Sequence, residues 1–231
     1  MTTVNRKQPE VAPIGAKAGF FEPMLCLAVE TLPEGPAWQY EVKLDGYRAI
    51  GVRTRSGVEL WSRNKWDFSR RFPNIARALR AVPVDTVLDG EIVAVNGDGL
   101  PSFSSLQNFG DGAAAILFYV FDAPVLAGAD LRGKPLAIRR KMMREVIPSL
   151  PDTIRFSETF DASGAELMAA VRSNGLEGVV AKRRDSSYKP GDRSGAWVKV
   201  ACESRSGIRD WRIPARFRNL RLDPGRVLRG T

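Results

Sequence analysis

Several short runs of this chain alternate between apolar and polar residues, which is the pattern of half-buried β-strands. One run covers 38–42 and a second covers 49–52. The dipeptide Asp45-Gly46 between them is a turn signal. We therefore expect a β-hairpin here, with Lys43 at the point where the first strand enters the turn.

The rest of the chain continues this mixture of short strands and helices. The expected strands cover 58–64, 86–95, 114–122, 153–158, 178–182 and 196–200, and the expected helices cover 72–82, 103–107, 136–147 and 164–173. Asp89-Gly90-Glu91 is expected to interrupt the second of these strands, and Asp122 to end the third. Hairpin signals are frequent and a regular β-α-β rhythm is absent, which favours an α+β fold with mainly antiparallel sheets flanked by helices.

Both ends of the chain differ from this central domain, which we place at 20–201. Residues 1–19 are polar, lack the apolar run of a signal peptide and are predicted to be disordered. Residues 202–231 hold eight arginines and three acids, with apolar residues between them. Such a tail contacts DNA phosphates, or packs on the domain with its arginines solvated. In the first interpretation, the DNA-binding candidates are Arg205, Arg209, Arg212 and Arg216.

Composition narrows the possible functions. The net charge of +9 and the pI of about 9.9 favour a polyanionic partner such as nucleic acid. The 231-residue chain has no histidine, which excludes histidine bases, Ser-His-Asp triads and histidine metal ligands. The two cysteines, Cys26 and Cys202, lie far apart, as in a reduced cytoplasmic protein. No stretch is apolar enough to cross a membrane.

Lys43 is the strongest candidate for covalent chemistry, in the pattern Lys43-x-Asp45-Gly46-x-Arg48. Only a neutral amine is nucleophilic, and a free lysine titrates near pH ~10.4. Partial burial and a neighbouring cation favour the neutral form, and the candidate cations are Arg48, Lys182 and Lys199. The alternative interpretation is a surface hairpin with solvated charges.

Charged residues inside other apolar runs raise the same question. Glu91, Glu177 and Lys199 each lie in a β-segment or next to one, where a charge needs an ion-pair partner or a ligand. Together with Lys43 they suit a nucleoside triphosphate, which requires cations for its phosphates, a carboxylate for Mg²⁺ and a nucleophile for the α-phosphorus. A purely structural role for each remains the alternative.

Six motifs in this order resemble the nucleotidyltransferase domain of ATP-dependent DNA ligases, most closely the ligase domain of bacterial end-joining ligases. They lie at 43–48, 62–64, 89–91, 118–122, 177–180 and 197–199, within a region of resemblance from about 21 to 200. The resemblance implies an ATP-grasp-like nucleotidyltransferase fold. It also implies ATP as the nucleotide, with Mg²⁺ as its metal.

The resemblance assigns a role to each motif. Lys43 becomes linked to AMP, and Glu177 serves the metal. Phe121 stacks on the adenine, with Tyr119 as the second choice on the same strand face. The nucleotide contacts assigned in this way are Glu41, Arg48, Arg63, Glu91, Phe121, Val180, Lys182 and Lys199.

The implied reaction joins a 5′-phosphate to a 3′-hydroxyl in nicked or broken double-stranded DNA during repair or recombination. Two departures bear on this expectation. Ala201 stands where the family has a second lysine, and only thirty residues follow it, too few for the family's OB-fold domain. We therefore expect slow sealing, a partner protein that supplies an OB-fold or end-binding function, and a cytoplasmic, nucleoid-associated location.

Two other functions stay open from the sequence. One is an RNA ligase or a capping-type nucleotidyltransferase. The other is a degenerate, non-catalytic DNA-binding or partner subunit, which Ala201 favours and the retained Lys43, Arg63, Glu91 and Glu177 oppose.

Overall fold

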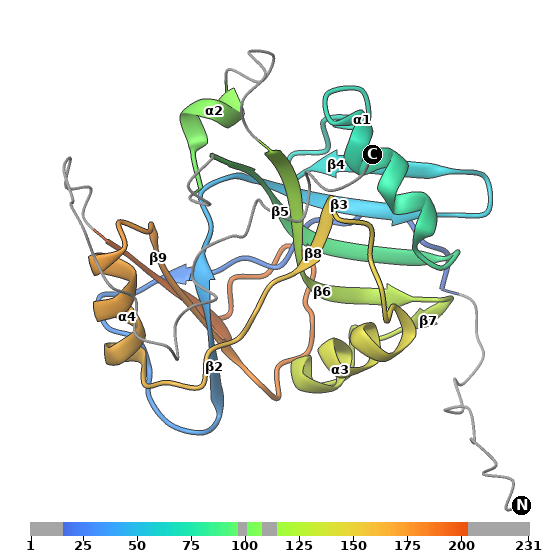
Figure 1. Ribbon diagram of the computed structural model, residues 1–231. Helices are drawn as coiled ribbons and strands as arrows, with labels where there is room; N and C mark the ends of the chain where they lie inside the picture. Colours follow the sequence, from blue (N-terminus) through green and yellow to red (C-terminus); the bar gives the residue numbers. More distant parts are fainter. Residues whose placement is uncertain (1–15, 97–100, 108–114, 203–231) are drawn as a thin grey trace, which may run out of the picture.

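The computed structural model describes residues 16–96, 101–107 and 115–202, which form two β-sheets with helices against them (Figure 1). The first sheet has the order β1 (Leu27–Ala28), β10 (Trp197–Ala201), β9 (Gly178–Arg183) and β2 (Trp38–Lys43). The second has the order β4 (Val58–Ser62), β3 (Tyr47–Arg53), β5 (Thr86–Val95), β6 (Ala115–Leu126) and β7 (Ala129–Asp130), and β8 (Ile154–Phe156) pairs with β6. Among the described strands, only β1–β10 and β6–β8 pair in parallel, so the prediction of mainly antiparallel sheets is confirmed.

The helices are α1 (Pro73–Ala78), α2 (Phe103–Gln107), α3 (Leu136–Val146) and α4 (Gly164–Ser173). A 3₁₀ turn (Leu79–Ala81) extends α1, so the expected 72–82 helix is present with a tighter second half. Ser163 and Glu166 form a capping box that starts α4. Buried residues of α1 and α3 pack on the six-stranded sheet, whereas those of α4 pack on the four-stranded sheet.

The expected hairpin around Lys43 is wrong. Strands β2 and β3 both exist, but β2 pairs with β9 and β3 pairs with β4 and β5. At Asp45-Gly46 the chain passes from one sheet to the other, and a Cβ on Gly46 would lie 2.1 Å from the carbonyl oxygen of Ile92. The local pattern could not reveal this, because β9, the partner of β2, is distant in the sequence. Lys43 is therefore the last residue of β2 in the four-stranded sheet, and β3 of the six-stranded sheet begins four residues later.

Two strand boundaries also differ from expectation. Asp89-Gly90-Glu91 does not interrupt β5; its pairing with β6 shifts register there instead. Gly90 permits the close pairing, since a Cβ would lie 2.4 Å from the Tyr119 carbonyl oxygen. Strand β6 continues past Asp122 because Arg139 of α3 neutralises this carboxylate at 2.6 Å, with both side chains 0% exposed.

Parts of the terminal segments lie outside the described residues. Of the expected N-terminal segment, residues 16–19 are described, and Ala16 and Ala18 pack against the buried Ile50–Val52–Val87–Val125 cluster. Residues 203–231 of the predicted tail, which include Arg205, Arg209, Arg212 and Arg216, are outside the described residues. Cys26 and Cys202 are free thiols. No helix in the described part of the chain is long and apolar enough to cross a membrane.

Candidate active site

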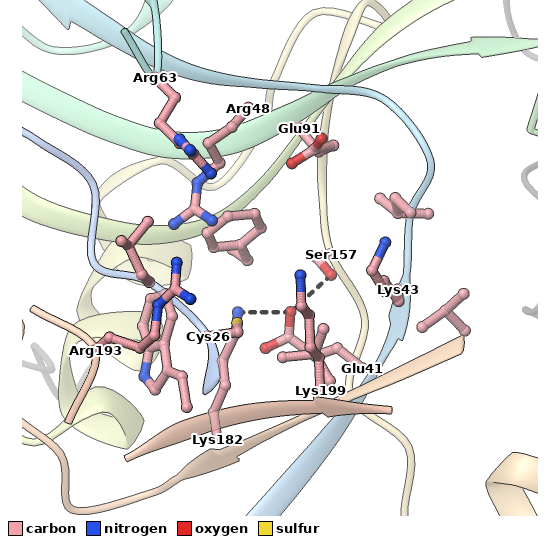
Figure 2. Close-up of a pocket in the computed structure, with 16 residues that line it drawn as sticks. Cys26, Glu41, Lys43, Arg48, Arg63, Glu91, Ser157, Lys182, Arg193 and Lys199 are labelled. Carbon is pink, nitrogen blue, oxygen red and sulfur yellow. Dashed lines mark hydrogen bonds and ion pairs between the residues drawn. The ribbon is translucent and has the colours of Figure 1, made fainter. Parts of the chain in front are cut away.

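A pocket of about 210 Å³ brings together residues from both sheets and from the loops around them (Figure 2). Strands β2, β9 and β10 contribute from the four-stranded sheet, and β3, β5 and β6 contribute from the other. The lining residues are Leu25, Cys26, Glu41, Val42, Lys43, Leu44, Arg48, Arg63, Glu91, Phe121, Ser157, Val180, Lys182, Arg193, Trp197 and Lys199. Every nucleotide contact predicted from the sequence is in this set.

Lys43 and Glu177 form an ion pair beside the pocket. Lys43 is opposite Gly178 in the β2–β9 ladder, so the residue before Gly178 is brought to the lysine. Oε1 of Glu177 accepts from Nζ of Lys43, while the buried Oε2 has no hydrogen-bond partner among the described residues. Burial raises the pKa of Glu177, and Lys43 opposes that shift. This carboxylate can therefore accept one more ligand.

The unpaired oxygen allows a test of whether the site suits Mg²⁺. This ion prefers oxygen ligands and is commonly held by one or two carboxylates together with substrate phosphates and water. Among the described residues, no group of three or more His, Cys, Asp or Glu side chains could hold a metal by itself. Glu177 fits a Mg²⁺ ion shared with phosphates, and the site does not fit a closed protein cage.

Glu41, two residues before Lys43 in β2, also lines the pocket, and Figure 2 shows the bonds that it receives from Lys182 and Ser157. Its Oε1 accepts from Arg140 at 3.0 Å and from Gln39 at 3.3 Å. Its Oε2 accepts from Lys182 at 2.9 Å and from Ser157 at 3.0 Å. Burial alone would raise the pKa of Glu41, but Lys182 and Arg140 outweigh burial and lower it. Glu41 is therefore a buried carboxylate fixed in its ionised form.

Arg140 joins the two sheets behind this carboxylate. Besides Glu41 of β2, its guanidinium donates to the carbonyl oxygens of Phe121 in β6 at 2.8 Å and of Ser157, just after β8, at 2.5 Å. The side chain is buried, so these bonds are made in a region of low dielectric. Arg140 thus sets the relative position of Glu41 and Phe121.

Of the two aromatic candidates from the sequence, Phe121 lines the pocket, whereas Tyr119 packs with Val93, Val95 and Leu117. Nζ of Lys182 lies 3.9 Å from the centroid of the Phe121 ring, and the Arg48 guanidinium carbon lies 4.5 Å from it. Cations close to an aromatic ring are attracted by its quadrupole. Two cations therefore lie close to the Phe121 ring, on which the resemblance predicts that the adenine stacks.

Arg48 is held by a buried network. Asp89 accepts from Nε and Nη2 of Arg48 at 2.6 and 2.7 Å and from the Tyr188 hydroxyl at 2.6 Å. Burial lowers the pKa of Arg48, but Asp89 outweighs burial and raises it, so Arg48 remains a permanent cation. Tyr188 belongs to the β9–β10 connection, and this bond attaches that loop to the six-stranded sheet.

Glu91 lines the pocket close to Lys43 and Arg48. Burial raises its pKa to about 7, against the attraction of Arg48 and Lys43. Its neutral and ionised forms therefore both occur near physiological pH. A carboxyl group in this state can donate or accept a hydrogen bond to a hydroxyl-bearing ligand.

Comparison with known proteins identifies the family of this domain. A family profile described as "ATP dependent DNA ligase domain" matches residues 23–201. The chain belongs to the ATP-dependent DNA ligase domain family. The family membership predicted from the six motifs is confirmed.

The relatives of this ligase domain are end-joining proteins and ligases. The multifunctional non-homologous end joining protein LigD of Pseudomonas aeruginosa is 38% identical over 187 residues, covering 79% of this chain and 22% of that protein. DNA ligase C1 of Mycolicibacterium smegmatis is 36% identical over 195 residues, covering 77% of this chain and 56% of that protein. The chain thus spans between about a fifth and about half of these relatives.

Solved structures agree on the fold of the ligase domain. The structure of mycobacterial DNA ligase D complexed with ATP and MES superposes with a TM-score of 0.68 at 34% identity, covering 78% of this chain and 59% of that one. The ligase domain of M. tuberculosis LigD gives the same TM-score at 35% identity, covering 78% and 58% of the two chains. The nucleotidyltransferase fold predicted from the motifs is confirmed.

Some residues of the ligase pocket were not predicted. Ser157 follows β8, Arg193 lies in the β9–β10 connection, and Cys26 precedes β1. They reach the pocket only through tertiary structure, and no local pattern marks them. Trp197 was part of a predicted motif without a role; it is 0% exposed, and its ring lies 4.5 Å from Nζ of Lys182.

Ala201, where the resemblance leads us to expect a second lysine in the family, lies on the pocket side of the four-stranded sheet. Ala201 is opposite Gly178 of β9, and Gly178 is opposite Lys43 of β2. Since strands are about 4.8 Å apart, Ala201 is about 10 Å from Lys43 across this row. Ala201 also shares a strand face with Lys199, which lines the pocket. A lysine at this position would add a cation near the nucleophile.

Proposed function

We propose that this domain transfers AMP from ATP through a covalent bond to Lys43. AMP then passes to the 5′-phosphate of a nicked or broken DNA duplex, and the 3′-hydroxyl displaces it to join the ends. The observation that carries this proposal is the pairing of Lys43 with Glu177, whose second oxygen is unpaired, beside a pocket lined by cations. The end-joining relatives support broken DNA as the substrate.

In the first step, neutral Nζ of Lys43 attacks the α-phosphorus of ATP. A phosphorus–nitrogen bond forms, and the bond to the pyrophosphate oxygen breaks. Oε1 of Glu177 contacts Nζ and is the acceptor for the ammonium proton, and its raised pKa favours this transfer. When bound, Mg²⁺ neutralises charge on the phosphates, and Glu177 Oε2 is the ligand that the protein offers it.

The remaining pocket residues position the nucleotide. Arg48, Arg63 and Lys199 provide positive charge for the phosphates and for the leaving pyrophosphate. Phe121 and Val180 enclose the base, and Glu91 contacts the ribose. The Glu41–Lys182 pair closes the base end, where it presents polar groups already fixed in place.

We assign DNA binding to the arginine-rich tail. Arg205, Arg209, Arg212 and Arg216 would contact phosphates without reading sequence, so binding should weaken steeply with salt. A partner protein that supplies an OB-fold or end-binding function would bind the rest of the duplex.

The proposal is tested in two stages with α-labelled nucleotide and Mg²⁺. We expect label from ATP, but much less from GTP, to remain on the denatured protein. The isolated adduct should then pass its label to nicked 5′-phosphorylated DNA. Preference for GTP would indicate a capping-type enzyme, and transfer only to RNA would indicate an RNA ligase. No adduct with either nucleotide would contradict the proposal and favour the non-catalytic subunit.

A further inference from the structure

Ser157 carries a hydroxyl group in the pocket, and the fold fixes its position. The residue follows β8, lines the pocket and is 6% exposed. Its backbone N–H donates to the carbonyl oxygen of Val120 at 2.7 Å, and its carbonyl oxygen accepts from Arg140 at 2.5 Å. The Ser157 hydroxyl is therefore held in place before any ligand binds.

The direction of the hydrogen bond between Ser157 and Glu41 follows from the charge on Glu41. Oγ of Ser157 lies 3.0 Å from Oε2 of Glu41, as the dashed line in Figure 2 marks. Lys182 and Arg140 lower the pKa of Glu41 against burial, so this carboxylate is ionised and can only accept. Ser157 must be the donor, and a hydroxyl has a single hydrogen to donate. Its oxygen therefore offers the pocket lone pairs alone.

Glu41 itself has no capacity for a further donor. An ionised carboxylate has about four lone-pair positions. Glu41 already accepts four hydrogen bonds, which come from Gln39, Arg140, Lys182 and Ser157. Lys182 can only donate, and the nearby thiol of Cys26 is a weak acceptor. Among the side chains that line the pocket beside Glu41, Ser157 is therefore the good acceptor that remains.

Arg140 also fixes the Ser157 hydroxyl relative to the Phe121 ring. The same guanidinium donates to the carbonyl oxygen of Phe121 at 2.8 Å and to that of Ser157 at 2.5 Å. Both side chains line one pocket of about 210 Å³. A purine base that stacks on Phe121 in so small a space has an edge within reach of the Ser157 oxygen.

We propose that Ser157 selects adenine by accepting a hydrogen bond from its 6-amino group. Guanine and hypoxanthine have an oxygen at this position, and that oxygen would meet the Ser157 lone pairs without a hydrogen between them. Two acceptors placed together in a buried site leave both unsatisfied, which disfavours the wrong base. Glu41, which the resemblance assigns to the nucleotide, then acts on the base through Ser157, whose hydrogen it holds. This inference rests on the proposed function, which places ATP in the pocket.

The test measures equilibrium binding of three nucleotides by calorimetry, without Mg²⁺, so that binding is followed apart from adduct formation. ATP is compared with purine riboside triphosphate, which lacks the 6-amino group, and with inosine triphosphate, which has an oxygen there. The proteins are wild type, Ser157→Ala and Ser157→Thr, which keeps a hydroxyl. Ser173→Ala is the matched control, because it removes a hydroxyl that donates to the Ala170 carbonyl in α4, outside the pocket lining. Melting temperatures confirm that each variant folds.

We expect wild type to bind ATP roughly tenfold more tightly than purine riboside triphosphate, the effect of one buried hydrogen bond, and to bind inosine triphosphate more weakly still. The difference between ATP and purine riboside triphosphate should disappear in Ser157→Ala and persist in Ser157→Thr and Ser173→Ala. A purely structural role would weaken the binding of all three nucleotides equally and keep their ratios. Unchanged ratios in Ser157→Ala, or equal binding of ATP and purine riboside triphosphate by wild type, would overturn the inference.

Adduct formation with labelled ATP and Mg²⁺ separates this inference from the proposed function. If wild type forms the adduct but the nucleotide ratios do not depend on Ser157, this inference alone fails. If the ratios depend on Ser157 but no adduct forms, the proposed function alone fails. Absence of both ATP binding and adduct would contradict the two together.

Discussion

Two glutamates at the site are in opposite states. Glu41 lines the pocket and forms what we call the saturated end of the site, whereas Glu177 lies beside the pocket and forms the open end. Glu41 accepts four hydrogen bonds from protein donors, and its pKa is lowered by Lys182 and Arg140 against burial. Glu177 pairs only with Lys43, its Oε2 is buried without a partner among the described residues, and burial raises its pKa. The hydrogen bonding of Glu41 is complete without a ligand, whereas that of Glu177 is not.

This difference separates structural from ligand-binding carboxylates. Nearly all buried polar atoms in folded proteins have partners, so an unpaired carboxylate oxygen beside a pocket is a candidate ligand contact. The saturated end fixes the shape of the pocket, because its network joins both sheets through Arg140. The open end keeps a nucleophile and a free acceptor side by side. Four substitutions test this division, beginning with the saturated end.

Arg140→Met should give the largest loss of stability. It leaves Glu41 short of a cation and strands the carbonyl oxygens of Phe121 and Ser157, so we expect a loss of about 3–5 kcal/mol in unfolding free energy. Arg144→Met is the matched control on the same helix, since its ion pair with Glu158 has the same 3.0 Å length but is exposed. That loss should stay below about 1 kcal/mol in denaturant titrations. Similar losses for both variants would mean that the Glu41 network is not structural.

Glu177→Gln should reduce adduct formation strongly and change stability little. An amide keeps most of the shape but binds a cation weakly and is a poor proton acceptor, so adduct formation should slow by roughly 100-fold or more. The melting temperature should stay close to wild type, because Glu177 is 32% exposed and has one partner. Glu158→Gln, at an exposed carboxylate, controls for the loss of charge. A large drop in melting temperature with normal labelling would place Glu177 in the structural class instead.

Glu91→Gln should change how stability depends on pH. The pKa of Glu91 is about 7 in the folded protein, above its ordinary value of 4.5, so folding takes up a proton between these values. The resulting stabilisation is full below pH 4.5 and is lost as pH rises through 7. The unfolding free energy of the variant relative to wild type should therefore rise by about 2 kcal/mol from pH 5 to pH 8. A stability difference between Glu91→Gln and wild type that stays constant with pH would refute the burial of this carboxyl.

Ala201→Lys should have the smallest effect. It adds a cation in the row that contains Gly178 and Lys43, at the open end of the pocket. We expect adduct formation to rise about threefold at low salt and less at high salt, as for a partly exposed charge. Ser56→Lys adds the same charge on the β3–β4 turn and should change nothing. Equal rate increases in both variants would mean that net charge, rather than position, is responsible.

The sequence predicted most elements of the fold and most of the charged residues of the pocket, because each motif lies on or beside a strand whose alternation is visible locally. It did not predict which strands pair. The Asp45-Gly46 signal reads as a hairpin, whereas the structure uses it to cross between sheets, and only long-range pairing of β2 with β9 reveals this. The same limit explains why Arg140 and Ser157 were missed, since both meet Glu41 only across the interface of the two sheets.

Locating the attached nucleotide tests the central claim most directly. Wild type and Lys43→Arg, which keeps the positive charge, are incubated with ATP and Mg²⁺, digested and analysed by mass spectrometry. The account predicts a single AMP on Lys43 in wild type and none on Lys43→Arg, with equal melting temperatures. AMP on any other residue, or an undiminished adduct in Lys43→Arg, would contradict it.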